Sequence, residues 1–169
     1  MNDSKLQTDR FLAMGIDIGV AIVLGIVGAI ISTLFGVVAG SIGKAIGGLI
    51  SGGIMAAYMA LRDIIFKGNS IGKHIMKLKT VDAATGNPIN ISQSIKRNIF
   101  FVIPPAIGAI FSILTIIPFI GVILRIIEVL VGLAGLVFFI IEIVKIVSTP
   151  EGIRLGDNFA NTKVVRIEG

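Results

Sequence analysis

One aspartate, Asp17, interrupts the apolar run 11–35, and Arg10 stands directly before that run. The two charged residues are seven positions apart, so on a helix they share one face and lie about 10 Å apart along its axis. A charged aspartate at the centre of a membrane helix costs about 2.5–3.5 kcal/mol, so its side chain must face other helices, pair with a cation or take up a proton. Asp17 therefore either binds a cation or a proton, or accepts hydrogen bonds that only fix the fold.

A second acid, Asp157, follows the last apolar run by ten residues. If both ends of the chain lie on the same side of a membrane, Asp157 can fold back to Arg10. An arginine and a carboxylate at such an interface can form a bidentate pair. We therefore predict a cluster of Arg10, Asp17 and Asp157 at the inner face of a helical bundle, where it would act as a gate if the protein is a transporter.

The last apolar run carries four charged residues of its own, Arg125, Glu128, Glu142 and Lys145. Each acid is three positions from a base, and this spacing predicts two ion pairs on a helix surface. Glu128 and Glu142 are fourteen positions apart and fall nearly on one face. They either line a cation path together with Asp17, or belong to local pairs whose long side chains reach the two membrane interfaces.

The composition predicts an integral membrane protein. The chain has 169 residues, of which 54% are hydrophobic and 15% charged, and its mean hydropathy is +0.99. A soluble domain of this length has too little interior to hide that much apolar surface.

The first ten residues do not resemble a signal peptide, so we expect the first apolar run to stay in the chain. The lack of cysteine in the sequence excludes disulfides and thiolate metal sites.

The apolar runs predict an all-α fold, a four-helix transmembrane bundle that forms a single domain over residues 1–169. A membrane helix needs ~20 residues. The spans cover about 11–35, 44–66, 99–117 and 122–147, with a loop at 67–98 and a tail at 148–169. Pro118 and Gly121 predict the turn between the last two spans. Pro104 and Pro105 either kink the third span or end a short interfacial helix before it.

The loop 67–98 is basic, with one acid, Asp82, against six bases. These are Lys67, Lys73, Lys77, Lys79, Lys96 and Arg97. The positive-inside rule then predicts that the loop and both termini lie in the cytoplasm, and that the protein resides in the inner (plasma) membrane. The bases are expected to contact anionic lipid, and no nucleic acid partner is expected.

Shorter patterns predict local structure in the loop and tail. Residues 75–82 have strand-like content, "AATGN" predicts a turn and "PINI" a returning strand, and the tail segment "NTKVVRI" also resembles a strand. We therefore expect a small sheet or hairpin on the cytoplasmic face. His74 is interpreted as a solvated neighbour of basic residues, and Arg62 and Asp63 as interfacial anchors.

Glycines spaced by four, such as Gly15 and Gly19, allow close helix packing, either within the bundle or in a homo-oligomer.

Arginine near the start of the first span, an aspartate within it and a late aspartate after the last span together resemble the RDD family of small multi-pass prokaryotic membrane proteins. Here these residues are Arg10, Asp17 and Asp157. The loop "SIGKHIMKLKTVDAATGNPI" resembles the family's G-K motif, here Gly72 and Lys73, and "LGDNFANTKVV" resembles its closing motif. That motif usually has histidine where this chain has glycine, before Asp157. The resemblance implies a membrane topology, with transport of ions or small solutes as the usual suggestion.

No set of residues indicates an enzyme, and no cofactor or metal site is expected. Two functions remain open. The chain is either a cation or proton-coupled transporter, such as an antiporter, that binds a monovalent cation or a proton at Asp17, or a non-transporting accessory protein that docks a larger complex through its basic loop and glycine faces. A requirement for Asp17 in transport would favour the first function, and a stoichiometric partner would favour the second.

Overall fold

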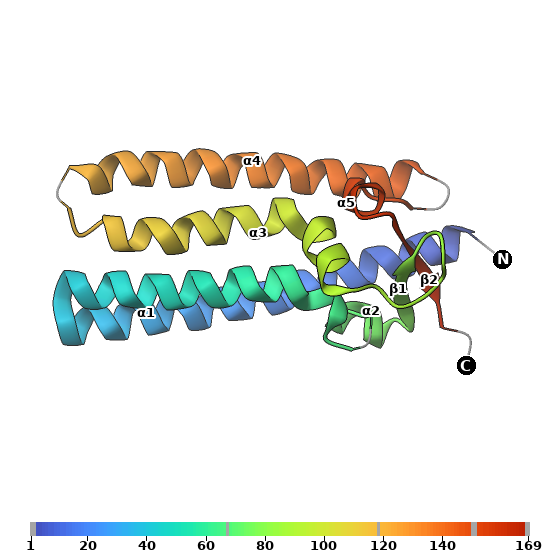
Figure 1. Ribbon diagram of the computed structural model, residues 1–169, viewed down its shortest axis with the longest axis horizontal. Helices are drawn as coiled ribbons and strands as arrows, with labels where there is room; N and C mark the ends of the chain where they lie inside the picture. Colours follow the sequence, from blue (N-terminus) through green and yellow to red (C-terminus); the bar gives the residue numbers. More distant parts are fainter. Residues whose placement is uncertain (1–2, 67, 118, 150–151, 168–169) are drawn as a thin grey trace. The chain divides into compact units, whose positions relative to one another are not determined.

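The computed structural model describes residues 3–66, 68–117, 119–149 and 152–167, and the chain divides into two compact units. The first unit comprises Met1–Val20, Met59–Ile99 and Phe138–Gly169, and the second comprises Ala21–Tyr58 and Phe100–Val137. Three long helices contribute residues to both units (Figure 1). Each unit is described separately below.

Helix α1, Asp3–Leu61, is broken at Ala39 and Gly40, where the backbone leaves helical geometry. Gly40 has a φ of 59°, which glycine adopts without the steric penalty of a side chain. In the second unit the segments before and after the break pack together: Ser51 Oγ donates to the Gly28 carbonyl oxygen at 2.8 Å, and a Cβ on Gly47 would lie 2.6 Å from Ser32 Cα. Figure 1 shows α1 reversing its direction at this break.

Helices α3, Ile91–Leu114, and α4, Ile120–Ser148, complete the long helices. In the second unit α3 packs on α1, where Ser112 Oγ donates to the Ala45 carbonyl oxygen at 3.0 Å. Pro104 and Pro105 lie inside α3, which begins eight residues before the predicted third span. The alternative of a separate interfacial helix that ends at these prolines is therefore wrong. The predicted turn residue Pro118 lies outside the described residues.

In the described chain three helices are long and apolar enough to cross a membrane, Lys5–Ile64, Ile91–Leu114 and Ile120–Ser148. Most of their large apolar side chains are exposed, as a lipid environment requires. Together with the mostly helical chain, this makes the protein a helical membrane protein, as the composition predicts. A straight helix of 59 residues would be about 88 Å long, roughly three times the thickness of the hydrocarbon core, so the break in α1 has a clear physical cause.

The first unit also contains the short elements. These are the 3₁₀ helix η1, Arg62–Ile64, helix α2, Ile71–Ile75, strand β1, Leu78–Asp82, helix α5, Leu155–Phe159, and strand β2, Thr162–Arg166. β1 and β2 pair antiparallel, with Leu78 opposite Arg166 and Asp82 opposite Thr162 (Figure 1). Ala13, Leu78 and Val164 form a small buried core beneath this ribbon.

The predicted hairpin within the loop is wrong in its second strand. The segment "PINI" contributes one isolated bridge, between Val81 and Pro88, and the tail strand β2 is the partner of β1. Proline has no N–H to donate, so the ladder cannot continue along this segment. The tail strand itself is found where the sequence predicts it.

Candidate functional site

Among the described residues of the first unit nine charged side chains are buried, and we term them the charge network. They come from α1, η1, α2, α3, α4, α5 and the residue before α5. Five are cations and four are carboxylates: Arg10, Arg62, Lys73, Arg97 and Arg154, with Asp17, Asp63, Glu142 and Asp157. Buried charges are tolerated where partners satisfy them, so the contacts within the network determine what it can do.

Asp157 lies at one centre of the network and is fully buried. Its Oδ2 is 2.5 Å from Arg10 Nη2, its Oδ1 is 2.8 Å from Arg97 Nη2, and the backbone N–H of Arg154 donates to Oδ2 at 3.0 Å. Burial alone would raise the pKa of Asp157, but Arg97, Arg154 and Arg10 lower it below the usual value. Asp157 is therefore held as a carboxylate by the three arginines.

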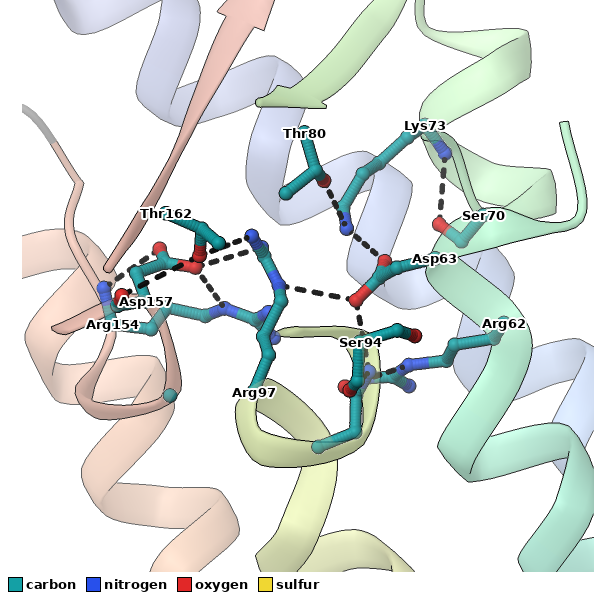
Figure 2. A network of polar contacts seen from close by, with 12 residues as sticks. Arg62, Asp63, Ser70, Lys73, Thr80, Ser94, Arg97, Arg154, Asp157 and Thr162 are labelled. Carbon is teal, nitrogen blue, oxygen red and sulfur yellow. Dashed lines mark hydrogen bonds and ion pairs between the residues drawn. The ribbon is translucent and has the colours of Figure 1, made fainter. Parts of the chain in front are cut away.

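Asp63 is the second centre. Its Oδ1 accepts from Lys73 Nζ, and its Oδ2 accepts from Asn98 Nδ2 at 2.9 Å and lies 3.1 Å from Arg97 Nε. Figure 2 shows Arg97 lying between Asp63 and Asp157. Arg97 thus joins both centres, with one guanidinium nitrogen on each carboxylate.

Asn98 extends this contact to Arg62, whose Nε and Nη2 donate to Asn98 Oδ1 at 3.1 and 2.7 Å. Because Asn98 also donates to Asp63, its amide links a cation and a carboxylate that are adjacent in sequence. The amide group is fixed by Ser94, whose carbonyl oxygen accepts from Asn98 Nδ2 at 3.0 Å. Arg62 and Asp63 are therefore buried members of the network, and their interpretation as interfacial anchors is wrong.

The side chain of Asp17 contacts the loop before and at the start of α2, and the two hydrogen bonds that it accepts there are not from Arg10 or Asp157. It accepts from Ser70 Oγ at 2.5 Å and from the backbone N–H of Gly72 at 2.7 Å, both at the start of α2. A Cβ on Gly72 would lie 2.0 Å from the Ala13 carbonyl oxygen, so only glycine lets α2 approach α1 this closely. The structure thus brings Arg10 and Asp157 together, and joins Asp17 to the Gly72–Lys73 motif.

Lys73 belongs to the network although it was expected in a solvated basic loop. Its Nζ donates to Asp63 and, at 3.1 Å, to Thr80 Oγ1. Burial and the nearby Arg97 lower the pKa of Lys73 to about 7, although Asp63 favours the ammonium form. A lysine with this pKa can gain or lose its charge near neutral pH.

Glu142 pairs with the tail and not with Lys145. Its Oε1 accepts from the backbone N–H of Gly156 at 2.9 Å, and its Oε2 lies 3.6 Å from Arg154 Nε. Lys145 is exposed and has no ion pair among the described residues, so the predicted Glu142–Lys145 pair is wrong. α4 turns Glu142 inward to the buried tail, whereas Lys145 faces outward. Burial alone would lower the pKa of Arg154, but Asp157 and Glu142 raise it.

Gly156 stands where the closing motif usually has histidine, and it lies in close contact with α3. A Cβ at this position would lie 2.1 Å from the Arg97 carbonyl oxygen. Any side chain, including histidine, would therefore push α5 away from α3. The glycine lets Asp157, the next residue, reach Arg97.

A small cavity of about 20 Å³ lies within the network. All five cations line it, and Asp17 is its one carboxylate among the described residues. A cavity of this size holds a single species about as large as a water molecule. Its surroundings are strongly positive, because the other three acids of the network do not line it.

The remaining candidates lie outside the network. In the second unit Arg125 Nη1 donates to Glu128 Oε2 at 2.8 Å, and both residues line a hollow of about 410 Å³ that also contains Lys44 and Ser112. In the first unit His74 is exposed, and its ring stacks on Phe66 with the centroids 4.7 Å apart.

Sequence reasoning missed Asp63, Arg97 and Arg154 as site residues. Arg97 was assigned to a solvated loop because the predicted third span begins at residue 99, whereas α3 begins at Ile91. A signal was available in "ISQSIKRN", where Ser94, Arg97 and Asn98 repeat at helical spacing and share one polar face.

One of the comparisons with known proteins gives a match. The family model described as "RDD family" matches residues 7–161, which include Arg10, Asp17 and Asp157. No curated protein and no solved structure was found to match the chain. Because the family match covers most of the chain, and the long helices are apolar, the protein is a membrane protein that belongs to the RDD family.

Proposed function

We propose that the chain crosses the plasma membrane four times, with both termini and the loop on the cytoplasmic side. The two segments of α1 count as two crossings, and α3 and α4 add one each. The pairing of β1 with β2 supports this topology, because the loop and the tail must share one side of the bilayer to form a ribbon. The contact of Arg10 with Asp157 also supports a common side for the start of α1 and the tail, and the basic residues favour the cytoplasm.

Within that topology the protein acts as a proton-coupled transporter of ions or small solutes, not as an enzyme. The observation that carries this function is the charge network, in which one lysine, Lys73, pairs with Asp63, a carboxylate that it shares with Arg97, at the ends of helices that pass through the membrane. Intramembrane and membrane-end ionisable clusters mark proton and ion pathways in transporters. A change in the charge of Lys73 alters its bond to Asp63, which is how proton uptake could be coupled to helix movement.

Asp17 has a positioning role in this proposal. It keeps Ser70 and Gly72 in place, and thereby holds α2 and Lys73 against Asp63. This favours the fold-fixing interpretation of Asp17 over direct binding of a cation. Arg10 and Asp157 form the gate on the same side by fastening the tail to α1.

Transport assays in proteoliposomes test the proposal. Vesicles with a trapped pH-sensitive dye receive a gradient of sodium, potassium or lithium ions, and proton movement is recorded for wild type, Lys73→Met and Asp17→Asn. We expect ion-dependent proton flux in wild type and at least a tenfold loss in Lys73→Met. Lys96→Met is the matched control, because Lys96 is an exposed lysine outside the network.

The outcomes separate the roles. Wild-type flux with unchanged rates in Lys73→Met would overturn the role of the network, and no ion-dependent flux in wild type for any of the three ions would overturn cation–proton exchange. Asp17→Asn is expected to lower flux and stability together, as a positioning residue does. Lower flux with unaltered stability would instead favour direct ion binding at Asp17.

One observation favours the second function, assembly with other chains. Gly15 and Gly19 lie four apart on α1, both are exposed, and a Cβ at either position would meet nothing within 4 Å among the described residues. Small residues at this spacing support close contact between membrane helices. Size measurement in mild detergent distinguishes the possibilities: a homogeneous oligomer that Gly15→Leu dissociates favours self-assembly, and a stoichiometric second protein favours an accessory role.

A further inference from the structure

The small cavity in the charge network has a lining that repels cations. Arg10, Arg62, Lys73, Arg97 and Arg154 all contribute to its wall. The one carboxylate in the described wall is Asp17. Both of its oxygen atoms already accept short hydrogen bonds from the start of α2.

The whole network carries the same imbalance. Among the described residues of the network, five cations face four carboxylates, so the positive charges outnumber the negative ones when every group is ionised. An uncompensated buried charge costs several kcal/mol. The excess of positive over negative side chains is larger in the described wall of the cavity, because Asp63, Glu142 and Asp157 contact the cations but do not line the cavity.

Arg154 supplies the independent observation. Its side chain is only 6% exposed, it lines the cavity, and its Nη2 has no hydrogen-bond partner among the described residues. Buried guanidinium N–H groups are nearly always satisfied by an acceptor. Here Asp157 and Glu142 approach Arg154 through Nε, at 3.8 and 3.6 Å, and leave Nη2 available.

We propose that this cavity binds one small inorganic anion of halide size, chloride in the first instance, which serves as the partner of Arg154 Nη2 and of the other cations that line the cavity. A volume of about 20 Å³ has room for one monatomic ion and is too small for an organic acid such as gluconate. Guanidinium groups are the preferred partners for anions in such sites because they are weakly hydrated and always charged. The inference does not rest on the proposed transport, since a bound anion can serve either function.

Thermal unfolding of the purified protein in detergent tests the proposal. The salt is sodium chloride, sodium bromide or sodium gluconate at equal ionic strength, so that general screening is the same in each. A ligand that binds only the folded state raises Tm in a saturable way. We expect chloride and bromide to raise Tm by several degrees over gluconate, which is too large for the cavity, with a midpoint that depends on halide concentration.

Two variants locate the effect. Arg154→Gln is expected to lose the halide-dependent shift, whereas Arg125→Gln is expected to keep it, because Arg125 lies in the second unit and is largely exposed. If Arg154→Gln does not fold, a crystal of the wild-type protein grown with bromide decides, through its anomalous signal at the cavity. Equal Tm values in halide and gluconate, or a crystal without bromide at the five cations, would show that the cavity holds water alone and would overturn the proposal.

Discussion

Replacement of Asp157 by asparagine isolates the contribution of one buried charge. Asparagine keeps the shape of the side chain, but Arg10 at 2.5 Å and Arg97 at 2.8 Å then face a neutral amide, and the backbone N–H of Arg154 loses a charged acceptor. Removal of one partner from a buried ion pair costs about 3–5 kcal/mol. The network also passes from one excess positive charge to two, so we expect the upper part of this range.

The assay is the thermal unfolding midpoint in detergent, with Glu128→Gln as the matched control. For a chain of this size each kcal/mol corresponds to about 2–4 °C, so a cost of about 4–5 kcal/mol for Asp157→Asn should lower Tm by about 8–20 °C. The control makes the same chemical change in the Arg125–Glu128 pair, where the arginine side chain is 61% exposed. Exposed pairs contribute about 0–1 kcal/mol, so its Tm should fall by no more than about 4 °C.

Acid dependence gives the same test a second readout. The pKa of Asp157 is lower in the folded than in the unfolded protein, so its contribution is present above the unfolded value of about 3.9 and is lost as the pH falls below it. Wild type should therefore lose stability below about pH 4 more steeply than Asp157→Asn. Equal midpoints for Asp157→Asn and Glu128→Gln at pH 7 would refute the idea that the network stabilises the fold.

Three further predictions concern the same unit. Gly156→Ala should lower Tm by several degrees, because its Cβ would lie 2.1 Å from a backbone oxygen of α3, whereas Gly132→Ala, with nothing within 4 Å, should not. The pKa of Lys73 is lowered to about 7 in the folded protein, so above pH 7 the unfolded chain binds more protons than the folded chain. The free energy of unfolding of the wild type, measured with denaturant, should therefore rise by about 2 kcal/mol from pH 7 to 9. Lys73→Met should show no such rise. Ser70→Ala removes the donor to Asp17 and should cost about 1–3 kcal/mol in the same assay, and a cost near zero would show that Asp17 does not hold the loop.

The membrane character and the contact of Arg10 with Asp157 could be predicted because each follows from a strong local signal. Long apolar runs have few alternatives to membrane helices, and the predicted even number of crossings would return the tail to the side on which the first helix begins. The pairing of β1 with the tail was less accessible. Both "PINI" and "NTKVVRI" have strand-like content, and only the missing N–H of Pro88 distinguishes them.

The centre of the network could not be predicted in the same way. Hydrophobic periodicity reports which residues face lipid, but it gives no information on which polar groups of a loop turn inward. Lys73 and Arg97 have the composition of a solvated basic segment, yet they are buried because Asp63 and Asp157 supply their counter-charges. The burial of Arg97 in particular depends on contacts with residues 34 and 60 positions away, which no single segment records.

The antiparallel pairing of β1 with β2 has a consequence for the biogenesis of the protein. A ribosome delivers Arg10, Asp63 and Arg97 to the membrane well before it completes Asp157 and β2. During that interval Arg10 has not yet met Asp157, and Arg97 can pair with Asp63 alone, so this unit reaches its final set of contacts only after Asp157 and β2 have emerged. A chain cut short before Asp157 would leave Arg97 with one of its two carboxylates and β1 without its partner strand.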